Sequence, residues 1–225
     1  MKASIIVFVW NMEDTLRKSI DSIIDNIGID DYECILVDGN SDDKSREICL
    51  EYQKYNKKIT YIKLNEYDEN KIWNAGIKYS NGEYLYFIKG CTYLAKGFIN
   101  NAVEYLDENI DTSVFIRNYK VINRDNKIMD FFHFFEDANI GPRLSMCVFR
   151  KSSIQEMFSG EFCSEPIFSG KIVRTQKYYY DRNNTNSFID TEKYDNRPFL
   201  YKTEIAPMYI NWIEYTQEKL NEYQK

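Results

Sequence analysis

Residues 36–43, LVDGNSDD, decide the fold. The apolar start continues a buried-strand pattern that begins at Cys34, and turn-forming residues follow at once. Asp38 therefore stands at the carboxyl end of a strand, where a carboxylate can accept hydrogen bonds from a nucleobase or a ribose. The helix expected over 43–55 begins with N–H groups that suit an anion. The plainer interpretation is an ordinary turn with Ser41 or Asp42 as the N-cap of that helix, and this segment alone favours the turn.

The alternation of strand and helix extends over the first half of the chain. Continuous β-branched and aromatic runs predict strands buried on both faces, at 4–9, 34–37, 59–64 and 84–88. Helical spacing of apolar residues and helix-end signals predict helices over 13–26, 43–55, 71–79 and 96–107. This order predicts right-handed βαβ units on a parallel sheet, which bind ligands outside the carboxyl ends of the strands. The loops to consider begin at Trp10, Asp38, Asn65 and Lys89.

The second half is less regular. Its β-forming runs predict strands at 113–121, 146–150 and 199–205. Its helical patterns predict helices over 152–157, 166–180 and 211–224, and Pro166 suits the first position of the second of these. A loop is expected over 183–186. The sequence contains no internal repeat or linker, so we expect a single domain over residues 1–225.

Composition excludes several classes of protein. A chain of 225 residues can bury a sizeable core without disulfides. A formal net charge of −6 does not suit a general nucleic-acid binder, which needs clustered Lys and Arg. The five cysteines form no CxxC pair, which indicates a reducing compartment, and one histidine makes a zinc site of His and Cys unfavourable.

The apolar run of residues 5–10 is too short to span a bilayer, and no small-residue cleavage signal follows it. We therefore expect a cytoplasmic protein. Peripheral association with the inner face of a membrane, or with a partner transferase, stays open.

Three segments in sequence order resemble family 2 glycosyltransferases of the GT-A fold. Residues 4–11, SIIVFVWN, resemble the family's first strand, which usually ends Pro-Val-Tyr-Asn, so Phe8 and Trp10 are departures. Residues 37–43 resemble its Val-Asp-(Asp/Gly)-Gly-Ser-Thr-Asp segment. Residues 73–77, WNAGI, and 80–88, SNGEYLYFI, resemble its Arg-Asn-Ala-Gly helix and Gly-Glu-Tyr strand, with Trp73 in place of Arg.

The resemblance implies a GT-A type three-layer α/β sandwich with a mostly parallel central sheet. Residues 1–105 would bind the nucleotide, and residues 106–225 would build the acceptor side. Asp38 would contact the nucleobase. The other residues expected to line the nucleotide site are Val7, Val9, Asn11, Glu13, Asn40, Asp68 and Lys71.

The main departure from the family follows the fourth strand. The family reads Asp-x-Asp there and holds Mg²⁺ or Mn²⁺ against the donor diphosphate, whereas this chain reads Lys89-Gly90-Cys91. Hard divalent ions prefer carboxylate oxygens, and an ammonium repels them, so we disfavour both ions as cofactors and assign no metal ligands. Two interpretations of Lys89 stay open: it neutralises the diphosphate itself, or it marks a protein that has lost catalysis and kept the fold for binding. A surface lysine with no role is the third interpretation.

An inverting transferase also needs a general base for the acceptor hydroxyl. Glu165 follows residues 148–152, VFRKS, which resemble the family's Phe-Arg-Arg-Ser stretch. Glu136-Asp137 matches the family's Glu-Asp dipeptide better but comes earlier. For either position, surface charge or helix capping is the plainer interpretation, and order favours Glu165 as the base.

The expected function is transfer of a sugar from a nucleotide sugar, UDP-linked by expectation, to a hydroxyl of a glycan, a lipid-linked saccharide or a protein, with inversion. Asp38 and Lys89 would grip the donor together across the ends of the first strands. A non-catalytic GT-A-like module that binds a nucleotide sugar or a partner transferase is the alternative. A nucleotidyltransferase is disfavoured, because its Gly-rich loop after the first strand is absent.

Overall fold

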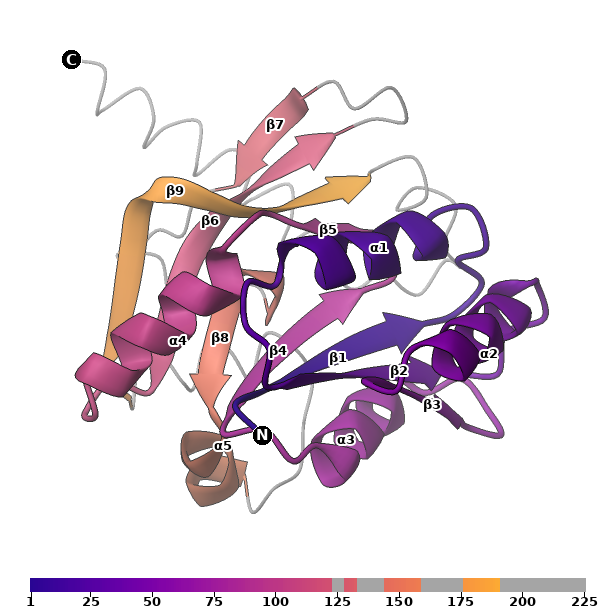
Figure 1. The fold of residues 1–225 in the computed structure, drawn as a ribbon, viewed down its shortest axis with the longest axis horizontal. Helices are drawn as coiled ribbons and strands as arrows, with labels where there is room; N and C mark the ends of the chain where they lie inside the picture. The colour runs from indigo at the N-terminus through magenta and orange to yellow at the C-terminus, as the bar shows by residue number, and fades with distance from the viewer. Residues whose placement is uncertain (123–127, 133–143, 159–175, 191–225) are drawn as a thin grey trace, which may run out of the picture. The chain divides into compact units, whose positions relative to one another are not determined.

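The computed structural model describes residues 1–122, 128–132, 144–158 and 176–190, which build a nine-stranded sheet with flanking helices (Figure 1). The strand order is β3-β2-β1-β4-β8-β6-β9-β5, and β7 pairs with β6 outside this path. The first four strands in that order are parallel. The α/β architecture expected from the sequence is confirmed.

The first half contains the elements that the sequence predicts, with their ends shifted by a few residues. Its parallel strands are β1 (Ala3–Val9), β2 (Tyr32–Asp38), β3 (Ile59–Lys63) and β4 (Tyr84–Lys89). Its helices are α1 (Leu16–Asn26), α2 (Ser45–Tyr55), α3 (Glu69–Tyr79) and α4 (Phe98–Glu108). Every residue of β1 and β4 is buried, because each strand has neighbours on both sides and helices cover the sheet.

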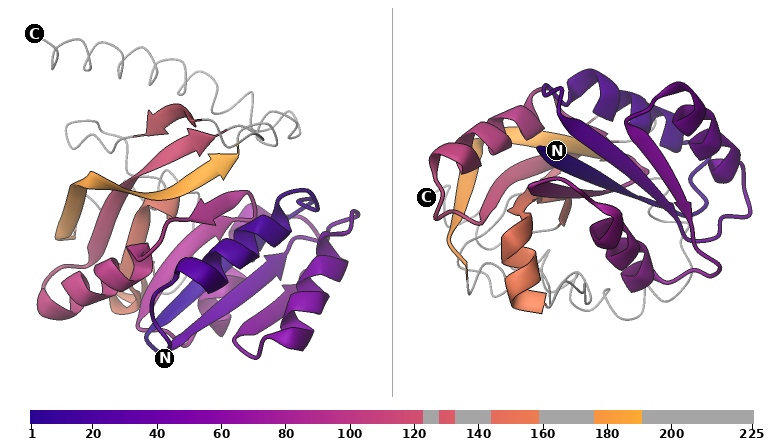
Figure 2. Two further views of the ribbon diagram at one scale, coloured as in Figure 1. Left: turned by 45° about the horizontal axis from the view of Figure 1, so that its top comes forward. Right: turned by 60° about the horizontal axis from the view of Figure 1, so that its bottom comes forward.

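The helices and this sheet form three layers. α1 and α2 cover one face of the parallel strands, and α3 covers the other (Figure 2). Right-handed crossovers require this division, since the chain crosses the sheet from β1 to β3 in one direction and returns to β4 in the other. Gly76 lets α3 approach closely, because a Cβ at this position would lie 2.2 Å from Cγ2 of Ile6.

This topology predicts where a ligand binds. The chain leaves β1 for β2 on one side, and β4 later pairs with β1 on the other side. Ligands of open α/β sheets bind outside the carboxyl ends of the strands at such a switch point. The end of β1 and the end of β4 are therefore the first places to examine.

The second half adds strands that make the rest of the sheet mixed. They are β5 (Thr92–Leu94), β6 (Val114–Ile122), β7 (Ile128–Phe132), β8 (Cys147–Arg150) and β9 (Tyr178–Asp190). A 3₁₀ turn, η1 (Leu144–Met146), precedes β8, and α5 (Lys151–Phe158) follows it. The predictions over 113–121, 146–150 and 152–157 are confirmed, whereas β5 and β7 were not predicted.

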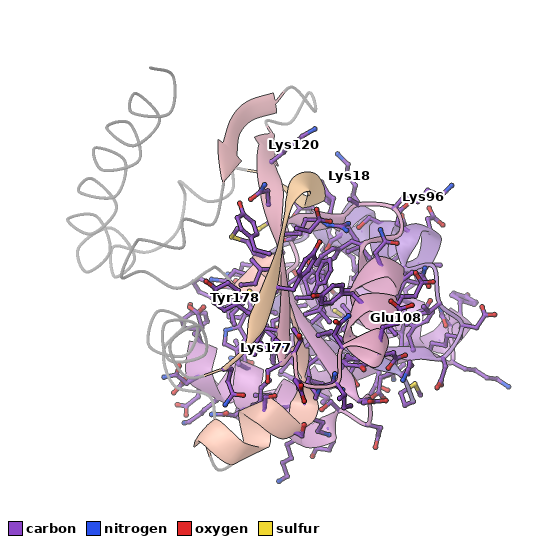
Figure 3. All side chains as sticks on the ribbon, turned by 90° about the vertical axis from the view of Figure 1, so that its left-hand side faces the viewer. Lys18, Lys96, Glu108, Lys120, Lys177 and Tyr178 are labelled. Carbon is purple, nitrogen blue, oxygen red and sulfur yellow. The ribbon has the colours of Figure 1, made fainter. Side chains whose placement is uncertain are left out.

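Two predictions in this half are wrong, because residues 178–190 form β9. This strand runs parallel to β6, and Figure 3 shows Lys177 and Tyr178 at its start. The helix predicted over 166–180 therefore cannot reach Tyr180. The loop predicted over 183–186 is part of a strand irregularity: Arg117 pairs with Asp181, and the next pair is Asn118 with Thr185.

Several predicted features lie outside the described residues. They include most of the helix over 166–180, the strand over 199–205 and the helix over 211–224. The single domain expected over 1–225 stays a prediction. Within the described part of the chain, no helix combines the length and the apolar character needed to cross a membrane.

Candidate functional site

Lys89 is the last residue of β4 and lies at the switch point. It pairs in register with Phe8 of β1, and only 7% of the residue is exposed. Its Nζ lies 3.0 Å from Oε1 of Glu69, the first residue of α3, and 5.3 Å from the centroid of the Phe8 ring. The ammonium is therefore held between a carboxylate and an aromatic face, and it is not a surface lysine without contacts.

Asp38 is fully buried at the end of β2, and both of its carboxylate oxygens accept hydrogen bonds. Oδ1 accepts from the Ser41 backbone N–H at 2.8 Å and from the Ser41 hydroxyl at 2.7 Å. Oδ2 accepts from the Tyr61 hydroxyl at 2.7 Å, and burial together with this bond raises the pKa of Tyr61. The carboxylate thus organises the turn after β2. Contact between Asp38 and a nucleobase stays a prediction.

The expected joint grip of one ligand by Asp38 and Lys89 needs correction. Asp38 is in register with Val9, and Lys89 is in register with Phe8. Because neighbouring residues of a strand point to opposite faces, these two side chains also point to opposite faces of the sheet. Asp38 faces the α2 side, where it meets Ser41 and Tyr61, and Lys89 faces α3.

Asn11 and Glu13 connect the loop after β1 to the loop after β2. The backbone N–H of Asn11 donates to the Ser41 hydroxyl at 3.0 Å, and its Oδ1 accepts from the Asp42 N–H at 3.0 Å. Oε2 of Glu13 accepts from the Lys44 N–H at 3.0 Å. These reciprocal bonds fix both loops at the carboxyl edge of the sheet.

Two asparagines give these loops their conformation. Asn11 has φ 52° and Asn40 has φ 65°, the left-handed region that asparagine tolerates better than most residues. The exposed Asn40 and the partly buried Asn11 are available beside the edge. The N-cap expected at Ser41 or Asp42 is wrong, because α2 begins at Ser45 with Lys44 as its N-cap.

The side chains of Val7 and Val9 belong to the core, and a role of their backbone in the nucleotide site stays a prediction. Both are fully buried, and Val7 pairs with Leu36 on one side and with Ile88 on the other. The carbonyl of Val9 accepts a hydrogen bond from the Gly39 N–H at 2.9 Å. Strand pairing uses the backbone here, and the chain leaves the sheet after β1, at Trp10.

Asp68 and Lys71 lie at the start of α3. Asp68 is the N-cap, and its Oδ1 accepts from the Lys71 N–H at 3.0 Å. The exposed Lys71 ammonium pairs with Glu66, and this hydrogen bond raises the pKa of Lys71. Asp68 therefore has a structural role, whereas Lys71 stays next to the edge as a candidate for phosphate contact.

The sequence analysis missed an aromatic pair at the same edge. The rings of Trp10 and Tyr67 lie 4.2 Å apart between centroids and are tilted by 43°. Trp10 follows β1 and Tyr67 precedes α3, so the pair joins loops that lead to opposite faces of the sheet. Tyr67 is 43% exposed, and a Cβ on Gly39 would lie 3.4 Å from its ring. The sequence did contain a signal for this pair, because Trp10 and Tyr67 each stand in a loop that follows a predicted strand.

The residues at the end of β4 do not fit the divalent cation that the resemblance implies. Lys89 supplies an ammonium, and Cys91 and Thr92 are each 1% exposed. Among the residues that the structure describes, no three His, Cys, Asp or Glu side chains are placed to hold a metal. Mg²⁺ and Mn²⁺ need several oxygen ligands, and this position offers none of the carboxylates that the family pattern places there. The predicted base Glu165 and its competitor Glu136-Asp137 lie outside the described residues.

The comparison with protein families decides the membership of this chain. The sequence model described as Glycosyl transferase family 2 matches residues 4–159, which is more than half of the chain. The chain belongs to glycosyl transferase family 2. The resemblance found in its first hundred residues is therefore confirmed.

Curated relatives of this chain include a teichoic acid biosynthesis protein and a glucosyltransferase. The minor teichoic acid biosynthesis protein GgaB of Bacillus subtilis is 36% identical over 108 residues, which are 47% of this chain and 12% of GgaB. The GalNAc(5)-diNAcBac-PP-undecaprenol beta-1,3-glucosyltransferase of Campylobacter jejuni is 26% identical over 79% of this chain and 54% of that protein. The chain thus spans about half or less of these relatives.

Solved structures of family 2 transferases support the GT-A fold. Staphylococcus aureus TarS residues 1–349, in complex with UDP-GlcNAc, superpose with a TM-score of 0.71 at 17% identity, covering 84% of this chain and 58% of that one. The mannosyltransferase PcManGT of Pyrobaculum calidifontis, in complex with GDP-Man and Mn²⁺, gives a TM-score of 0.64 at 13% identity, over 82% of this chain and 56% of that one. At these identities the likeness shows the fold.

Proposed function

We propose that this chain transfers a sugar from a nucleotide sugar, with UDP as the carrier, to a hydroxyl of a glycan, a lipid-linked saccharide or a protein. The observation that carries the proposal is that Lys89 and Tyr67 both lie against the Phe8 ring at the switch point of a family 2 sheet. Tyr67 also pairs with Trp10. The crystallised TarS binds UDP-GlcNAc and UDP, which supports a uridine carrier.

The nucleotide is proposed to lie along the carboxyl edge of β1 and β4. The aromatic pair offers a partly exposed surface on which a nucleobase can stack. Asn11 and Asn40 flank this surface and offer polar groups for the base or ribose. Asp38 would act mainly by holding the Asn40 turn in place.

The diphosphate is proposed to approach the end of β4. Lys89 is a point charge that can neutralise a phosphate, and Lys71 is a second cation at the start of α3. This arrangement would replace the divalent cation of the family pattern by side-chain ammonium groups. Retained use of Mg²⁺ or Mn²⁺ is the disfavoured outcome.

The reaction is proposed to be a direct displacement with inversion. The acceptor oxygen forms a bond to the anomeric carbon, the bond from that carbon to the diphosphate oxygen breaks, and the hydroxyl proton passes to a carboxylate. Glu165 is the proposed base, on the order of residues in the sequence alone.

A non-catalytic module is the second candidate, and one observation favours it. The ammonium that would replace the cation is already neutralised by Glu69 at 3.0 Å. Such a chain would bind a nucleotide sugar or a partner transferase without turnover.

Two measurements separate the candidates. A thermal-shift screen of UDP and UDP-sugars, with and without Mn²⁺, tests binding, because a ligand of the native state raises the melting temperature. Release of UDP from a UDP-sugar in the presence of EDTA tests turnover. Binding with EDTA-resistant turnover supports the transferase, and binding without turnover supports the module. If no nucleotide changes the melting temperature, both candidates are wrong.

A further inference from the structure

The Lys89–Glu69 pair differs from the other lysine–carboxylate pairs near the site in its burial. The Lys89 side chain is 9% exposed and that of Glu69 is 24% exposed. The neighbouring pair, Lys71 with Glu66, has side chains that are 58% and 65% exposed. Exposed pairs contribute little because water and salt screen them, whereas a pair at the end of β4 is screened much less.

The contact between Glu69 and Lys89 is held by charge more than by hydrogen-bond direction. Oε1 of Glu69 is buried, and within the described part of the chain it accepts no hydrogen bond of acceptable geometry. A carboxylate oxygen in this position has lost its water without gaining a well-directed donor, which is an unfavourable state for a buried charge. An incoming anion with better geometry could therefore displace Glu69 from the ammonium.

The residues around this pair are the ones that depart from the family pattern. Phe8 and Trp73 have ring centroids 5.4 Å apart, and Lys89 lies over the Phe8 ring. Glu69 and Trp73 are four residues apart on α3 and so share a face of the helix. In the family pattern the helix carries an arginine at position 73 and the strand carries an acid at position 89. Here the strand carries a cation at position 89, and the acid that pairs with it, Glu69, stands four residues before Trp73 on α3.

We propose that Glu69 is an internal counter-charge that occupies the Lys89 ammonium until a diphosphate displaces it, and that it thereby sets the affinity of the site for diphosphates. This inference rests on the proposed function, because it needs the donor's diphosphate to reach Lys89. Glu69 is a positioning residue in this scheme. It lowers the affinity for any anion that must compete with it, and it leaves the affinity for an uncharged nucleoside unchanged.

The test compares dissociation constants of UDP, uridine and inorganic pyrophosphate for the wild type and for Glu69→Gln, by titration calorimetry at low salt. Glutamine keeps the size of the side chain and removes its charge. We expect UDP and pyrophosphate to bind about tenfold more tightly to the variant, less than the full Coulomb interaction of two charges at this distance, because Glu69 is partly exposed. Uridine should bind equally to both proteins.

A matched control and a second background make the result decisive. Glu51→Gln removes a carboxylate from the exposed Arg17–Glu51 pair on α1 and α2, and it should leave all three affinities unchanged. In a Lys89→Met background, Glu69→Gln should tighten UDP binding less than in the wild type, because it then removes only the repulsion between the carboxylate and the diphosphate. Thermal unfolding of each variant confirms that it folds.

Three results overturn the inference. They are unchanged or weaker UDP binding by a folded Glu69→Gln protein, equal tightening in the Lys89→Met background, and equal tightening of uridine. Uridine binding without any effect of Glu69 removes the inference and keeps the nucleotide site. If neither uridine nor UDP binds to any variant, the proposed function is wrong and the inference is overturned with it.

Discussion

The two ends of the parallel strands both carry charged clusters, and the clusters are built differently. At the amino ends, Lys2 donates to Asp107 at 2.8 Å and to Glu83 at 2.9 Å. The Tyr84 hydroxyl donates to Asp107 at 2.6 Å, and Arg150 donates to that hydroxyl at 3.2 Å. Burial alone would raise the pKa of Asp107, but the bonds from Lys2 and Tyr84 outweigh it and lower the pKa.

At the carboxyl ends, Lys89 forms an ion pair with Glu69, with 3.0 Å between Nζ and Oε1. Its carboxylate partner Glu69 accepts no hydrogen bond on Oε1 within the described residues. The aromatic pair above β1, Trp10 and Tyr67, is partly open to solvent. The amino-end network joins several elements, and the Lys89–Glu69 contact at the carboxyl ends joins β4 to α3 beside the Phe8 ring of β1.

This difference indicates what each end does. A network whose donors and acceptors are satisfied makes the native state rigid, and removing a buried member such as Arg150 leaves acceptors without their donor. A charge pair with poor hydrogen-bond geometry stabilises little and can exchange its partner for a ligand. We therefore expect substitutions at the amino ends to change stability, and substitutions at the carboxyl ends to change binding.

The largest effect is expected for Arg150→Ala at the amino ends. Arg150 is 9% exposed and donates to the carbonyls of Thr112 and Leu106 and to the Tyr84 hydroxyl. Its loss leaves the Thr112 and Leu106 carbonyls without this donor. It also removes one of the two bonds of the Tyr84 hydroxyl, which still donates to Asp107. The free energy of unfolding should therefore fall by about 3–4 kcal/mol. Urea unfolding measures the change.

Arg17→Ala is the matched control, because it removes an arginine from an exposed ion pair with Glu51. The expected loss is within about 1 kcal/mol. The comparison between the two ends fails if Arg150→Ala leaves stability intact, or if a folded Arg150→Ala protein loses its affinity for UDP.

Lys89 gives the largest expected effect on binding. Lys89→Ala should weaken UDP binding by about 10- to 100-fold, since a hydrogen bond to a charged group contributes about 1.5–3 kcal/mol. Lys89→Asp should weaken UDP binding further, because it places a second carboxylate beside that of Glu69 at the end of β4. The two carboxylates together create a site for Mn²⁺.

The measurement is the melting temperature with and without MnCl₂. Mn²⁺ should stabilise the Lys89→Asp protein and should not stabilise the wild type or Lys89→Ala. Equal stabilisation of the wild type by Mn²⁺ would show that a metal binds elsewhere at this edge, against the proposed role of the ammonium.

The aromatic pair gives the next effect. Trp10→Ala should weaken the binding of UDP and of uridine alike by about tenfold, because stacking of a base on an aromatic ring contributes about 1–3 kcal/mol. Tyr55→Ala, at a residue that is 75% exposed on α2, is the control and should change neither affinity. Weaker UDP binding with unchanged uridine binding would place the base elsewhere.

The fold of the first half could be predicted because its signals are local. Continuous apolar strands and turn residues identify β1 to β4, and their alternation with helices predicts right-handed βαβ units on a parallel sheet. The strand order, and with it the switch point, comes from the structure. The second half depends on pairing between distant segments. β9 pairs with β6 over residues 114–122, and nothing in the Tyr178–Tyr180 run states that partner. The turn signal over 183–186 was real but belongs to an irregularity inside the strand.

The candidate site could be predicted in place but not in geometry. Sequence order brings Asp38 and Lys89 to the same edge of the sheet, and only the register shows that they point to opposite faces. The partner of Lys89 is also a tertiary fact, since Glu69 reads as an ordinary acidic residue in the first turn of a helix. Likewise, the contact of Trp10 with Tyr67 joins two loops that are far apart in the chain.

The smallest expected effect concerns Asp38, which lies at the carboxyl edge of the sheet. Both of its oxygens accept hydrogen bonds, as in the amino-end network, so it tests whether position or bonding decides the role of a residue. Tyr61→Phe removes the hydroxyl that donates to Oδ2 of Asp38, and leaves a buried oxygen without that donor. The free energy of unfolding should fall by about 1 kcal/mol at neutral pH. If Asp38 is structural, UDP affinity should change little.

The pH dependence gives this prediction its sign. Burial and the bond to Asp38 raise the pKa of Tyr61 above the value near 10 of an unfolded tyrosine. A group whose pKa is higher in the folded state stabilises the protein fully below its unfolded pKa, and this contribution is lost as the pH rises toward the folded pKa. Wild-type stability should therefore decline above about pH 10 more steeply than that of Tyr61→Phe. If the stability of the two proteins declines equally with pH, Tyr61 does not stabilise the Asp38 carboxylate. If a folded Tyr61→Phe protein no longer binds UDP, Asp38 belongs to the binding site.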